Sequence, residues 1–509
     1  MNSTIDNAKH HFTRGLDLLK RQNYIEAAEE FSQAHILAPD RISTLVNLSA
    51  TLIQLCRWPE CEKICRKILS LEPKNYDALL NLGVCLSYSE QSSLALEYLN
   101  QAIDINPSLD LAWINKGNIL QEWGDINQAS LCFDTALSIN ALSQEALIGR
   151  GNLRNEKMEY LLALEDFDAA LAINPSNPKA KWNKALSLLR QGNFEKGWEL
   201  YESRWEISGM REQKRHTSIP LWLGEKSLND KTILIYTEQG YGDAIQFSRY
   251  APILESKGAN VIIEAPKSLM GLLTTLSPTI KVIENGSLSF NTVLSQKIDF
   301  QCPIMSLALA FQTKLETIPK SKFYLSANKN RQYFWRARLN DNSNKNNLIN
   351  PKRVGLTWSG SGHYAGKKNL KRDVPLKEIT HSLSHFAGNN IEFHSLQISP
   401  SQQDLTLLAE SSIYSHHEYL DDFLETACLI NELDLIISVD TSVAHLSGAL
   451  GKETWILLPS PPDFMALIDS PCHPWYDNTK FIRQVTPKKW TSVMNQVSNK
   501  LNVWLSQDQ

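Results

Sequence analysis

A 34-residue spacing in the first half of the chain constrains the fold more than any other feature. Proline recurs at this step, with Ala141 in the one slot that lacks it: Pro39, Pro73, Pro107 and Pro175. Three other slots keep the same register: Ala27, Cys61, Ala95, Ala129 and Ala163; Phe31, Cys65, Leu99, Phe133 and Phe167; and Ala34, Ile68, Ala102, Ala136 and Ala170. Small residues let two helices approach closely, and proline ends a helix. The period therefore predicts a solenoid of helix pairs.

These slots resemble those of the tetratricopeptide repeat, and Gly83, Gly117 and Gly151 fill the glycine slot of its first helix. We expect five units, at 8–41, 42–75, 76–109, 110–143 and 144–177, and a degenerate sixth at 178–211 that carries QGNFEKGWELYESRW. Asparagines recur in the first helices, with Gly149 as a gap: Asn47, Asn81, Asn115 and Asn183. Such a ladder can grip a peptide backbone, but it is also a common polar lining of this repeat class. The repeats alone leave the ligand open.

Composition limits the class of protein. A chain of 509 residues exceeds one ordinary core and should hold about two to four domains. The net charge of −4 is spread along the chain, which argues against nucleic-acid binding. No apolar run long enough for a transmembrane helix or a secretory signal is present. Eight cysteines without a CxxC pair suggest reduced thiols and a cytoplasmic protein, and Cys61 and Cys65 fall on core slots as packed thiols rather than ligands.

The second half alternates between strand-like and helix-like runs. Apolar strand-like runs are TILIY (232–236), ANVIIEA (259–265), IKVI (280–283), RVGLTW (353–358), IEFHSL (391–396), LDLIISV (433–439) and TWILLP (454–459). Such alternation predicts parallel sheets with helices on both faces. We expect a solenoid over 1–211, a linker over 212–230, one α/β lobe over 231–340, an asparagine-rich linker over 341–352 and a second α/β lobe over 353–509. Ligands bind beyond the carboxyl ends of strands in such sheets.

The first candidate site lies in YTEQGYGDAIQF, residues 236–247, where a strand gives way to a helix. Gln239, Gly240 and Gly242 form a turn that exposes its backbone, and Asp243 opens the helix. An aspartate there is also a favoured helix cap, so a purely structural role is the alternative. The glycines, helix start and acid together favour a turn that lets a substrate approach.

The second candidate site is LTWSGSGHYAGKKNLKRD, residues 356–373. Ser359 and Gly360 begin a run of small residues after a strand, and a cluster of cations follows: His363, Lys367, Lys368, Lys371 and Arg372. Backbone N–H groups and cations together can hold an anion. A flexible, solvated basic loop is the alternative.

The third candidate site is ISVDTSVAHLSGALG, residues 437–451. Asp440 ends a strand, Thr441 or Ser442 can cap the next helix, and His445 lies one turn into it. The N–H groups and positive dipole end of such a helix suit phosphate oxygens. A lone histidine is more often structural, but two hydroxyls and an acid beside it favour ligand contact.

These stretches together resemble glycosyltransferase family 9, the bacterial heptosyltransferases of the lipopolysaccharide core, which have the two-lobed GT-B fold with Rossmann-like lobes. The matching stretches run in family order over nearly all of 231–505: EQGYGDAIQFSRY, VGLTWSGSGHYAG, FHSLQ, LDLIISVDTSVAHLSGALG and PWYDNTKFIRQ. With the repeats, joined through FEKGWELYESRW, the chain is similar to bacterial proteins that fuse a repeat arm to a heptosyltransferase-like domain. It is more distantly similar to protein O-linked N-acetylglucosamine transferases.

The resemblance implies an inverting glycosyltransferase with a nucleotide-diphosphate sugar as substrate and no cofactor. Asp243 matches the family's candidate general base. The implied donor-binding residues are Ser359, Gly360, Arg372, Gln397, Asp440, Thr441, Ser442 and His445, and the acceptor-side turn is Gln239, Gly240 and Gly242. Family members carry a KxW arrangement after the small-residue loop. This chain reads KKNLKRDVPL, so Arg372 is the nearest candidate for the missing charge, with Lys368 behind it.

No DxD pair faces the expected cleft, so we predict no metal site; Asp421 and Asp422 look instead like a helix start. The partners implied are a nucleotide sugar, a glycan, lipid-linked or protein acceptor, and a peptide or protein in the repeat groove. Two other functions stay open: a non-catalytic scaffold with a degenerate transferase domain, and a protein O-glycosyltransferase. An enzyme acting on a lipid-linked acceptor would be cytoplasmic and peripheral at the inner membrane.

Overall fold

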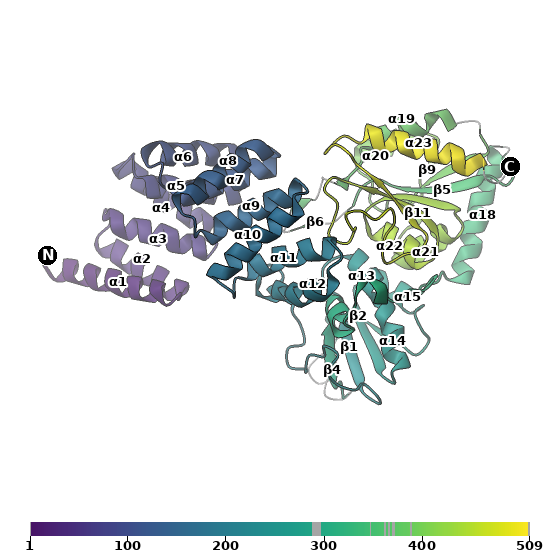
Figure 1. The fold of residues 1–509 in the computed structure, drawn as a ribbon, viewed down its shortest axis with the longest axis horizontal. Helices are drawn as coiled ribbons and strands as arrows, with labels where there is room; N and C mark the ends of the chain where they lie inside the picture. The colour runs from purple at the N-terminus through teal and green to yellow at the C-terminus, as the bar shows by residue number, and fades with distance from the viewer. Residues whose placement is uncertain are drawn as a thin grey trace. The chain divides into compact units, whose positions relative to one another are not determined.

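The computed structural model describes residues 2–287, 297–346, 348–360, 363–364, 367–368, 372–386 and 389–506, and divides into two compact units, Met1–Asn183 and Lys184–Gln509 (Figure 1). Antiparallel helix pairs build the first unit: α1 (Asn2–Lys20), α2 (Tyr24–Leu37), α3 (Ile42–Gln54), α4 (Trp58–Leu71), α5 (Tyr76–Tyr88), α6 (Ser92–Ile105), α7 (Asp110–Trp123), α8 (Ile126–Ile139), α9 (Gln144–Glu156), α10 (Tyr160–Ile173) and the start of α11 (Pro178–Arg190). The first helices of successive pairs start 34 residues apart, at Ile42, Tyr76, Asp110, Gln144 and Pro178. The predicted helical solenoid is confirmed.

The recurring small residues allow the close packing within each pair. Gly151 lies so near the next helix that a Cβ there would be 2.5 Å from the Phe167 ring. At Gly149, the gap in the asparagine ladder, a Cβ would be 2.4 Å from Phe133, so packing explains the missing asparagine. Cys61 is fully buried among apolar side chains in the core, as predicted for a packed thiol.

The first sheet of the second unit follows α12 (Phe194–Tyr201) and holds four parallel strands in the order β3-β2-β1-β4. The strands are β1 (Thr232–Tyr236), β2 (Asn260–Ala265), β3 (Lys281–Glu284) and β4 (Phe300–Pro303). Their connecting helices include α13 (Tyr241–Phe247), α14 (Ala251–Ser256) and α15 (Lys267–Leu273). Residues 212–230, expected as a linker, pack on this sheet, since the Trp222 N–H donates to the Gln301 carbonyl at 2.9 Å.

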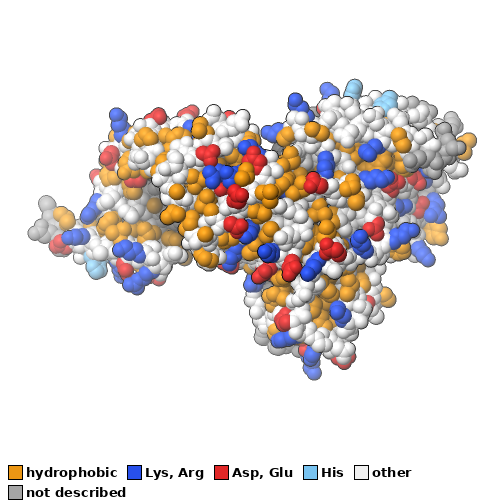
Figure 2. Space-filling model, viewed as in Figure 1, with side chains coloured by type: hydrophobic (Ala, Val, Ile, Leu, Met, Phe, Trp, Pro, Cys, Tyr) orange, Lys and Arg blue, Asp and Glu red, His pale blue; other side chains and the backbone are white. Residues whose placement is uncertain are grey.

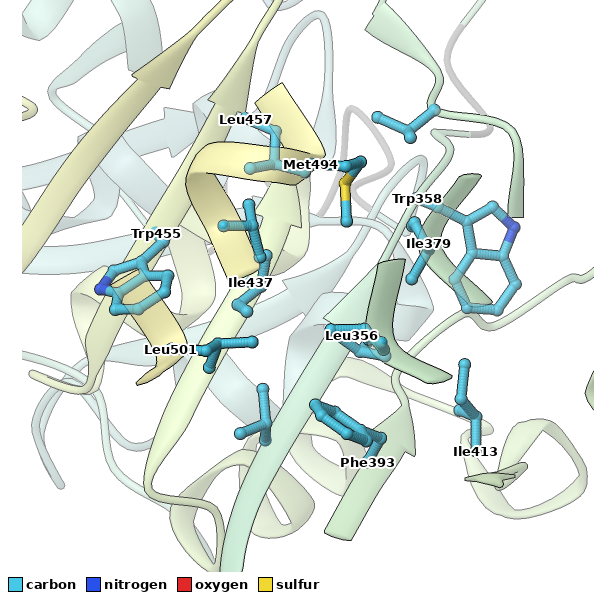
Figure 3. Packing of buried hydrophobic residues seen from close by; sticks show 14 of the residues in the cluster. Leu356, Trp358, Ile379, Phe393, Ile413, Ile437, Trp455, Leu457, Met494 and Leu501 are labelled. Carbon is cyan, nitrogen blue, oxygen red and sulfur yellow. The ribbon is translucent and has the colours of Figure 1, made fainter. Parts of the chain in front are cut away.

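The second sheet is parallel throughout, in the order β12-β11-β10-β5-β8-β9. Its strands are β5 (Lys352–Thr357), β8 (Ile391–Ser395), β9 (Ile413–Tyr414), β10 (Leu435–Val439), β11 (Glu453–Leu458) and β12 (Thr479–Arg483). On one face, Trp455 and Leu457 of β11 join a core with α19 (Leu376–Leu383) and α23 (Thr491–Ser506) (Figure 3). Ile456 and Leu458 point to the other face, where α22 (Ser442–Ala449) packs. The alternation confirms a parallel sheet covered on both faces.

All seven predicted strands are present. Five described strands were not predicted: β4, β9, β12, and the short antiparallel pair β6 (His363–Tyr364) and β7 (Lys367–Lys368). The asparagine-rich stretch 341–352 is not wholly a linker, because α18 (Lys329–Lys345) runs into it. Trp335, Leu339 and Ser343 are buried along one face of this helix, at the four-residue spacing that anchors a helix.

The surface carries mixed charge. Lys, Arg, Asp and Glu side chains are interspersed over the face seen in Figure 2, in keeping with the net charge of −4. Among the helices described, none combines the length and apolarity needed to cross a bilayer.

Candidate functional site

The turn after β1 presents Asp243 at the start of α13. Gln239 adopts a left-handed backbone conformation with φ of +59°, and Gly240 occupies the cap position of the helix. The Gly240 N–H donates to Asp243 Oδ2 at 3.0 Å. Asp243 therefore does carry the capping role considered as the structural alternative. That role uses one carboxylate oxygen and leaves Oδ1 for other contacts.

The environment of Asp243 makes its carboxyl group basic. Burial is the main cause that raises its pKa to about 7, and the negative charges of Asp463, Glu238 and Asp440 act in the same direction. The hydrogen bond from Gly240 opposes the shift. A carboxyl group with this pKa is part protonated and part ionised at neutral pH, which suits proton transfer.

The turn after β10 presents a second set of groups at the start of α22. Thr441 is the cap residue, but its side chain makes no capping hydrogen bond and contacts Ser438 Oγ at 3.2 Å instead. Ser442 begins the helix. The first-turn N–H groups of α22 are thus left without a side-chain cap, as an anion site at a helix N-terminus requires.

His445 lies one turn into α22, between an acid and a phenol. Its Nε2 is 3.7 Å from Asp440 Oδ1, and its Nδ1 is 3.3 Å from the Tyr476 hydroxyl. Burial lowers the pKa of His445 to about 4, so the ring is neutral at physiological pH. Gly448, further along α22, makes room for the Tyr476 ring, which a Cβ would meet at 2.6 Å.

The two turns meet, although they belong to different sheets. A Cβ on Gly242 would lie 2.7 Å from His445 Cδ2, so the absence of a side chain at Gly242 permits the contact. Arg249, just after α13, donates to the Trp475 carbonyl at 2.6 Å. This hydrogen bond also joins the region after β1 to the region of the second sheet. Asp243, Asp440 and His445 are therefore brought together as one cluster.

Arg372 reaches the same cluster from the basic loop. Its Nη1 donates to the Asp440 carbonyl at 3.1 Å, and its guanidinium lies over Gly360, where a Cβ would be 2.2 Å from Nη2. Beside it, the Ser359 N–H donates to Gln397 Oε1 at 3.3 Å. The structure thus places Ser359, Gly360, Gln397 and Arg372 next to one another. The side chains of His363, Lys367, Lys368 and Lys371 lie outside the described residues.

Asp463 is a member of the cluster that the sequence analysis missed. It lies in the loop after β11, and its side chain is open to solvent although protein atoms crowd around it. The surrounding protein atoms displace water from the Asp463 carboxylate, which is the main reason its pKa is raised. The negative charge of Asp440 raises the pKa of Asp463 further. Its place in the sequence could have revealed it, since PPDF comes soon after the TWILLP strand and so lies at the carboxyl edge of the sheet, where ligands bind.

A pocket of about 210 Å³ adjoins the turn after β1. Its walls come from the carboxyl ends of the first sheet and from the segment before β1, and include Gln213, Arg215, Gln239, Tyr241, Pro266 and Asn285. Asp422 lies elsewhere, as the cap of α21 (Phe423–Asn431), accepting from the Glu425 N–H at 2.7 Å. It has the helix-start role predicted for it. Within the described part of the chain, no group of three or more His, Cys, Asp or Glu could hold a metal ion.

Comparisons with known proteins bear on the repeats. Tetratricopeptide repeat models match residues 76–109, 111–141 and 157–204. Protein FlbA of Caulobacter vibrioides is 24% identical over 453 residues, which are 84% of this chain and 73% of that protein. BBSome complex member BBS4 of Mus musculus is 28% identical over 107 residues, 21% of this chain and 20% of that one. Among solved structures, a thermophilic tetratricopeptide repeat protein of Thermus thermophilus is 18% identical, covers 36% of this chain and 99% of its own, and has a TM-score of 0.33.

The first unit is thus a tetratricopeptide repeat solenoid, and this class of fold indicates a peptide or protein partner. The second unit contains two parallel sheets whose carboxyl ends carry the cluster around Asp243 and His445.

Proposed function

We propose that the second unit is an inverting glycosyltransferase of the family 9 type, with a GT-B arrangement of its two sheets. It would move a sugar from a nucleotide-diphosphate donor to an acceptor hydroxyl. The observation that carries the proposal is the meeting of Asp243, a carboxyl group with a pKa of about 7, with the uncapped N-terminus of α22. A base and an anion site that face each other are what sugar transfer from a diphosphate requires.

The reaction assigns one task to each side of the cluster. The acceptor oxygen attacks the anomeric carbon as the bond from that carbon to the diphosphate oxygen breaks, which inverts the anomeric centre. Asp243 takes the hydroxyl proton, and the bonding electrons leave with the diphosphate. General-base help of this kind typically contributes about 10²- to 10⁴-fold in rate. The first-turn N–H groups of α22, Thr441 and Arg372 would stabilise the charge that grows on the diphosphate.

His445 would act as a neutral hydrogen-bond donor rather than as a cation. With its pKa lowered to about 4, it keeps one N–H at neutral pH and can give it to a phosphate or ribose oxygen. Gln397, held beside the small-residue loop, would lie near the base of the nucleotide. The pocket next to Gln239 and Gly240 would receive the acceptor.

The repeats would select or dock the acceptor or its carrier. Two asparagines of the predicted ladder already use their side-chain amides within their own helices, which weakens the case for a peptide backbone bound by the ladder. Asn47 donates to Ser43 O at 2.8 Å and Asn115 to Leu111 O at 2.7 Å, so these two amides bond to the preceding turn of their own helix. A protein acceptor, which would make the chain a protein O-glycosyltransferase, therefore rests on the general use of this repeat class for protein binding.

The test is a thermal-shift and calorimetric screen with UDP, GDP, ADP and CMP, the last serving as the monophosphate comparison. We expect one diphosphate to stabilise the parent, and Asp440→Ala and His445→Ala to lose the effect. Asp421→Ala, which removes an exposed aspartate at a helix start, is the matched control and should retain it. A search for acceptors would follow, with Asp243→Asn as the inactive comparison.

Silence from all four nucleotides would count against the proposal. The remaining function would then be a non-catalytic scaffold, in which the repeats bind a protein and the transferase domain is degenerate. Capture of a defined protein partner by the full chain, unaffected by Asp243→Asn, would be the expected property of that scaffold.

A further inference from the structure

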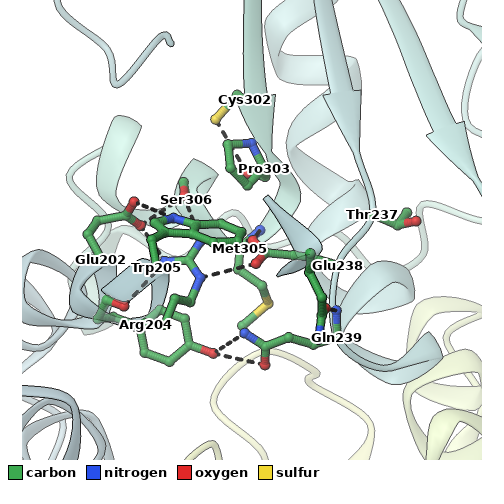
Figure 4. Close-up of polar contacts among 12 residues, drawn as sticks. Glu202, Arg204, Trp205, Thr237, Glu238, Gln239, Cys302, Pro303, Met305 and Ser306 are labelled. Carbon is green, nitrogen blue, oxygen red and sulfur yellow. Dashed lines mark hydrogen bonds and ion pairs between the residues drawn. The ribbon is translucent and has the colours of Figure 1, made fainter. Parts of the chain in front are cut away.

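A buried arginine ties the segment after α12 to the turn that carries Asp243. Arg204 lies in the short helix η1 (Glu202–Glu206) and is fully buried. Its Nη2 and Nε donate to the two carboxylate oxygens of Glu238 at 2.8 and 3.1 Å, in a paired arrangement visible in Figure 4. Nη2 also donates to Ser306 Oγ at 2.7 Å, and Nη1 to Glu202 Oε1 at 2.6 Å. One side chain thus joins η1 to the residues that follow β1 and β4.

A second contact reaches the turn itself. The Tyr201 hydroxyl at the end of α12 accepts a hydrogen bond from Gln239 Nε2 at 2.9 Å, and lies 3.1 Å from Gln239 Oε1. Gln239 holds the left-handed conformation that turns the chain toward Gly240. Its N–H donates to Gln213 Oε1 at 3.0 Å, so Gln239 is contacted both by the end of α12 and by the segment that follows it.

The Arg204–Glu238 ion pair does more than stabilise the fold, because it also fixes one arrangement of the two segments. A buried ion pair is on average no more stabilising than apolar side chains of the same volume, and its best-attested use is to define one arrangement. Here the pair is bidentate, which fixes both distance and orientation. It acts on Glu238, five residues before Asp243, while Tyr201 acts on Gln239.

We propose that Tyr201 and Arg204 are positioning residues that hold the Gln239–Asp243 turn in the geometry needed for proton transfer. The inference deepens the proposed function and rests on it for its kinetic part. The tetratricopeptide repeat match extends over 157–204, so residues that belong to a degenerate repeat by sequence serve the turn of the α/β region. The FEKGWELYESRW segment is then a functional part of the transferase site and not a spacer.

The test uses Tyr201→Phe in the full-length protein, with Tyr250→Phe as the matched control. Tyr250 is also fully buried in the same region, and its hydroxyl contacts Thr313 Oγ1 at 2.6 Å, away from the turn. Hydrogen exchange of the backbone amides over 237–247 is measured in both variants and in the parent. We expect faster exchange over these residues in Tyr201→Phe only, with the amides of α22 unchanged.

The kinetic measurement separates positioning from binding. For Tyr201→Phe we expect kcat to fall roughly 10- to 100-fold, as a displacement of about 1 Å at a reacting group can do, with KM for the donor unchanged. Because Tyr201 acts through Gln239, the double variant Tyr201→Phe/Gln239→Ala should lose no more activity than either single variant.

Unchanged exchange over 237–247 in Tyr201→Phe would overturn the inference, as would equal losses of kcat in the two tyrosine variants. An inactive parent that binds no nucleotide would overturn the proposed function instead. The exchange measurement would then still decide whether Tyr201 holds the turn.

Discussion

Replacing Asp243 by asparagine should stabilise the protein, and only above a certain pH. In an unfolded chain an aspartate titrates near pH 3.9, whereas in the folded protein the pKa of Asp243 is raised to about 7, mainly by burial. Between these values the folded protein keeps a proton that the unfolded chain has released. Ionised Asp243 therefore costs folding free energy, and the parent loses stability from this group as pH rises from about 4 to about 7.

The size of the effect follows from the two pKa values. Their difference is roughly three units, and each unit corresponds to about 1.36 kcal/mol, which sets a ceiling of about 4 kcal/mol above pH 7. Asp243 retains part of its exposure to solvent, so we expect about 1 to 2 kcal/mol. Asparagine can still accept the hydrogen bond from Gly240 through its carbonyl oxygen, so the turn should keep its conformation.

Urea unfolding of the parent and of Asp243→Asn at pH 4, 6 and 8 measures this difference. We expect the two proteins to match at pH 4 and the variant to be more stable at pH 8. The other titrating groups are common to both proteins and largely cancel. Asp421→Asn is the control and should change stability by less than about 0.5 kcal/mol at each pH. A difference that is constant with pH, or a parent that is more stable at pH 8, would refute the reasoning about a desolvated carboxyl group.

Three further changes test the packing of the structure by the same unfolding assay. Gly242→Ala puts a methyl group 2.7 Å from the ring of His445 and should destabilise the protein by about 1 to 3 kcal/mol, although alanine favours a helix; a stabilised variant would contradict the contact between the two turns. Arg204→Met leaves Glu238 buried without its partner and should cost about 3 to 5 kcal/mol, and adding Glu238→Leu should restore most of that loss; no recovery in the double variant would argue against the ion pair. Phe167→Ala removes a fully buried ring from the solenoid and should cost about 3 to 5 kcal/mol, and a loss below about 1 kcal/mol would show that this repeat slot is not a core position.

The repeats and most of the strands were predictable because their signals are local and periodic. A slot such as Phe167 recurs at a fixed step, and a strand such as β10 is a short apolar run bounded by polar residues. The helix α18 was hidden because most of its residues are polar, and only the spacing of Trp335, Leu339 and Ser343 reveals its buried face. Strand β4 was hidden because four residues that end in proline carry little periodicity.

The candidate site was predictable as separate pieces but not as a cluster. Asp243 and His445 each follow a strand, which marks them as residues at the carboxyl edge of a sheet. Their meeting depends on a contact between α13 and α22, at Gly242, that no local pattern encodes, because the two helices follow strands of different sheets. Asp463 was missed for a related reason, because its loop has no glycine turn and no helix start to draw attention. The Arg204–Glu238 pair spans 34 residues of sequence and could be recognised only from the fold.

The most direct test of the account is the pH dependence of nucleotide release from a panel of UDP-, GDP- and ADP-sugars, by the parent and by Asp243→Asn. Water takes the place of the acceptor hydroxyl in this assay, receives the sugar and gives its proton to Asp243. Because the base must be ionised to accept a proton, we predict that the rate rises about tenfold per pH unit below pH 7 and levels off above it, following the pKa of about 7 of Asp243. The Asp243→Asn variant should bind the nucleotide but release little of it at any pH. Release by the variant at the rate of the parent, or a parent rate that does not change between pH 5 and 9, would contradict the assignment of Asp243 as the base.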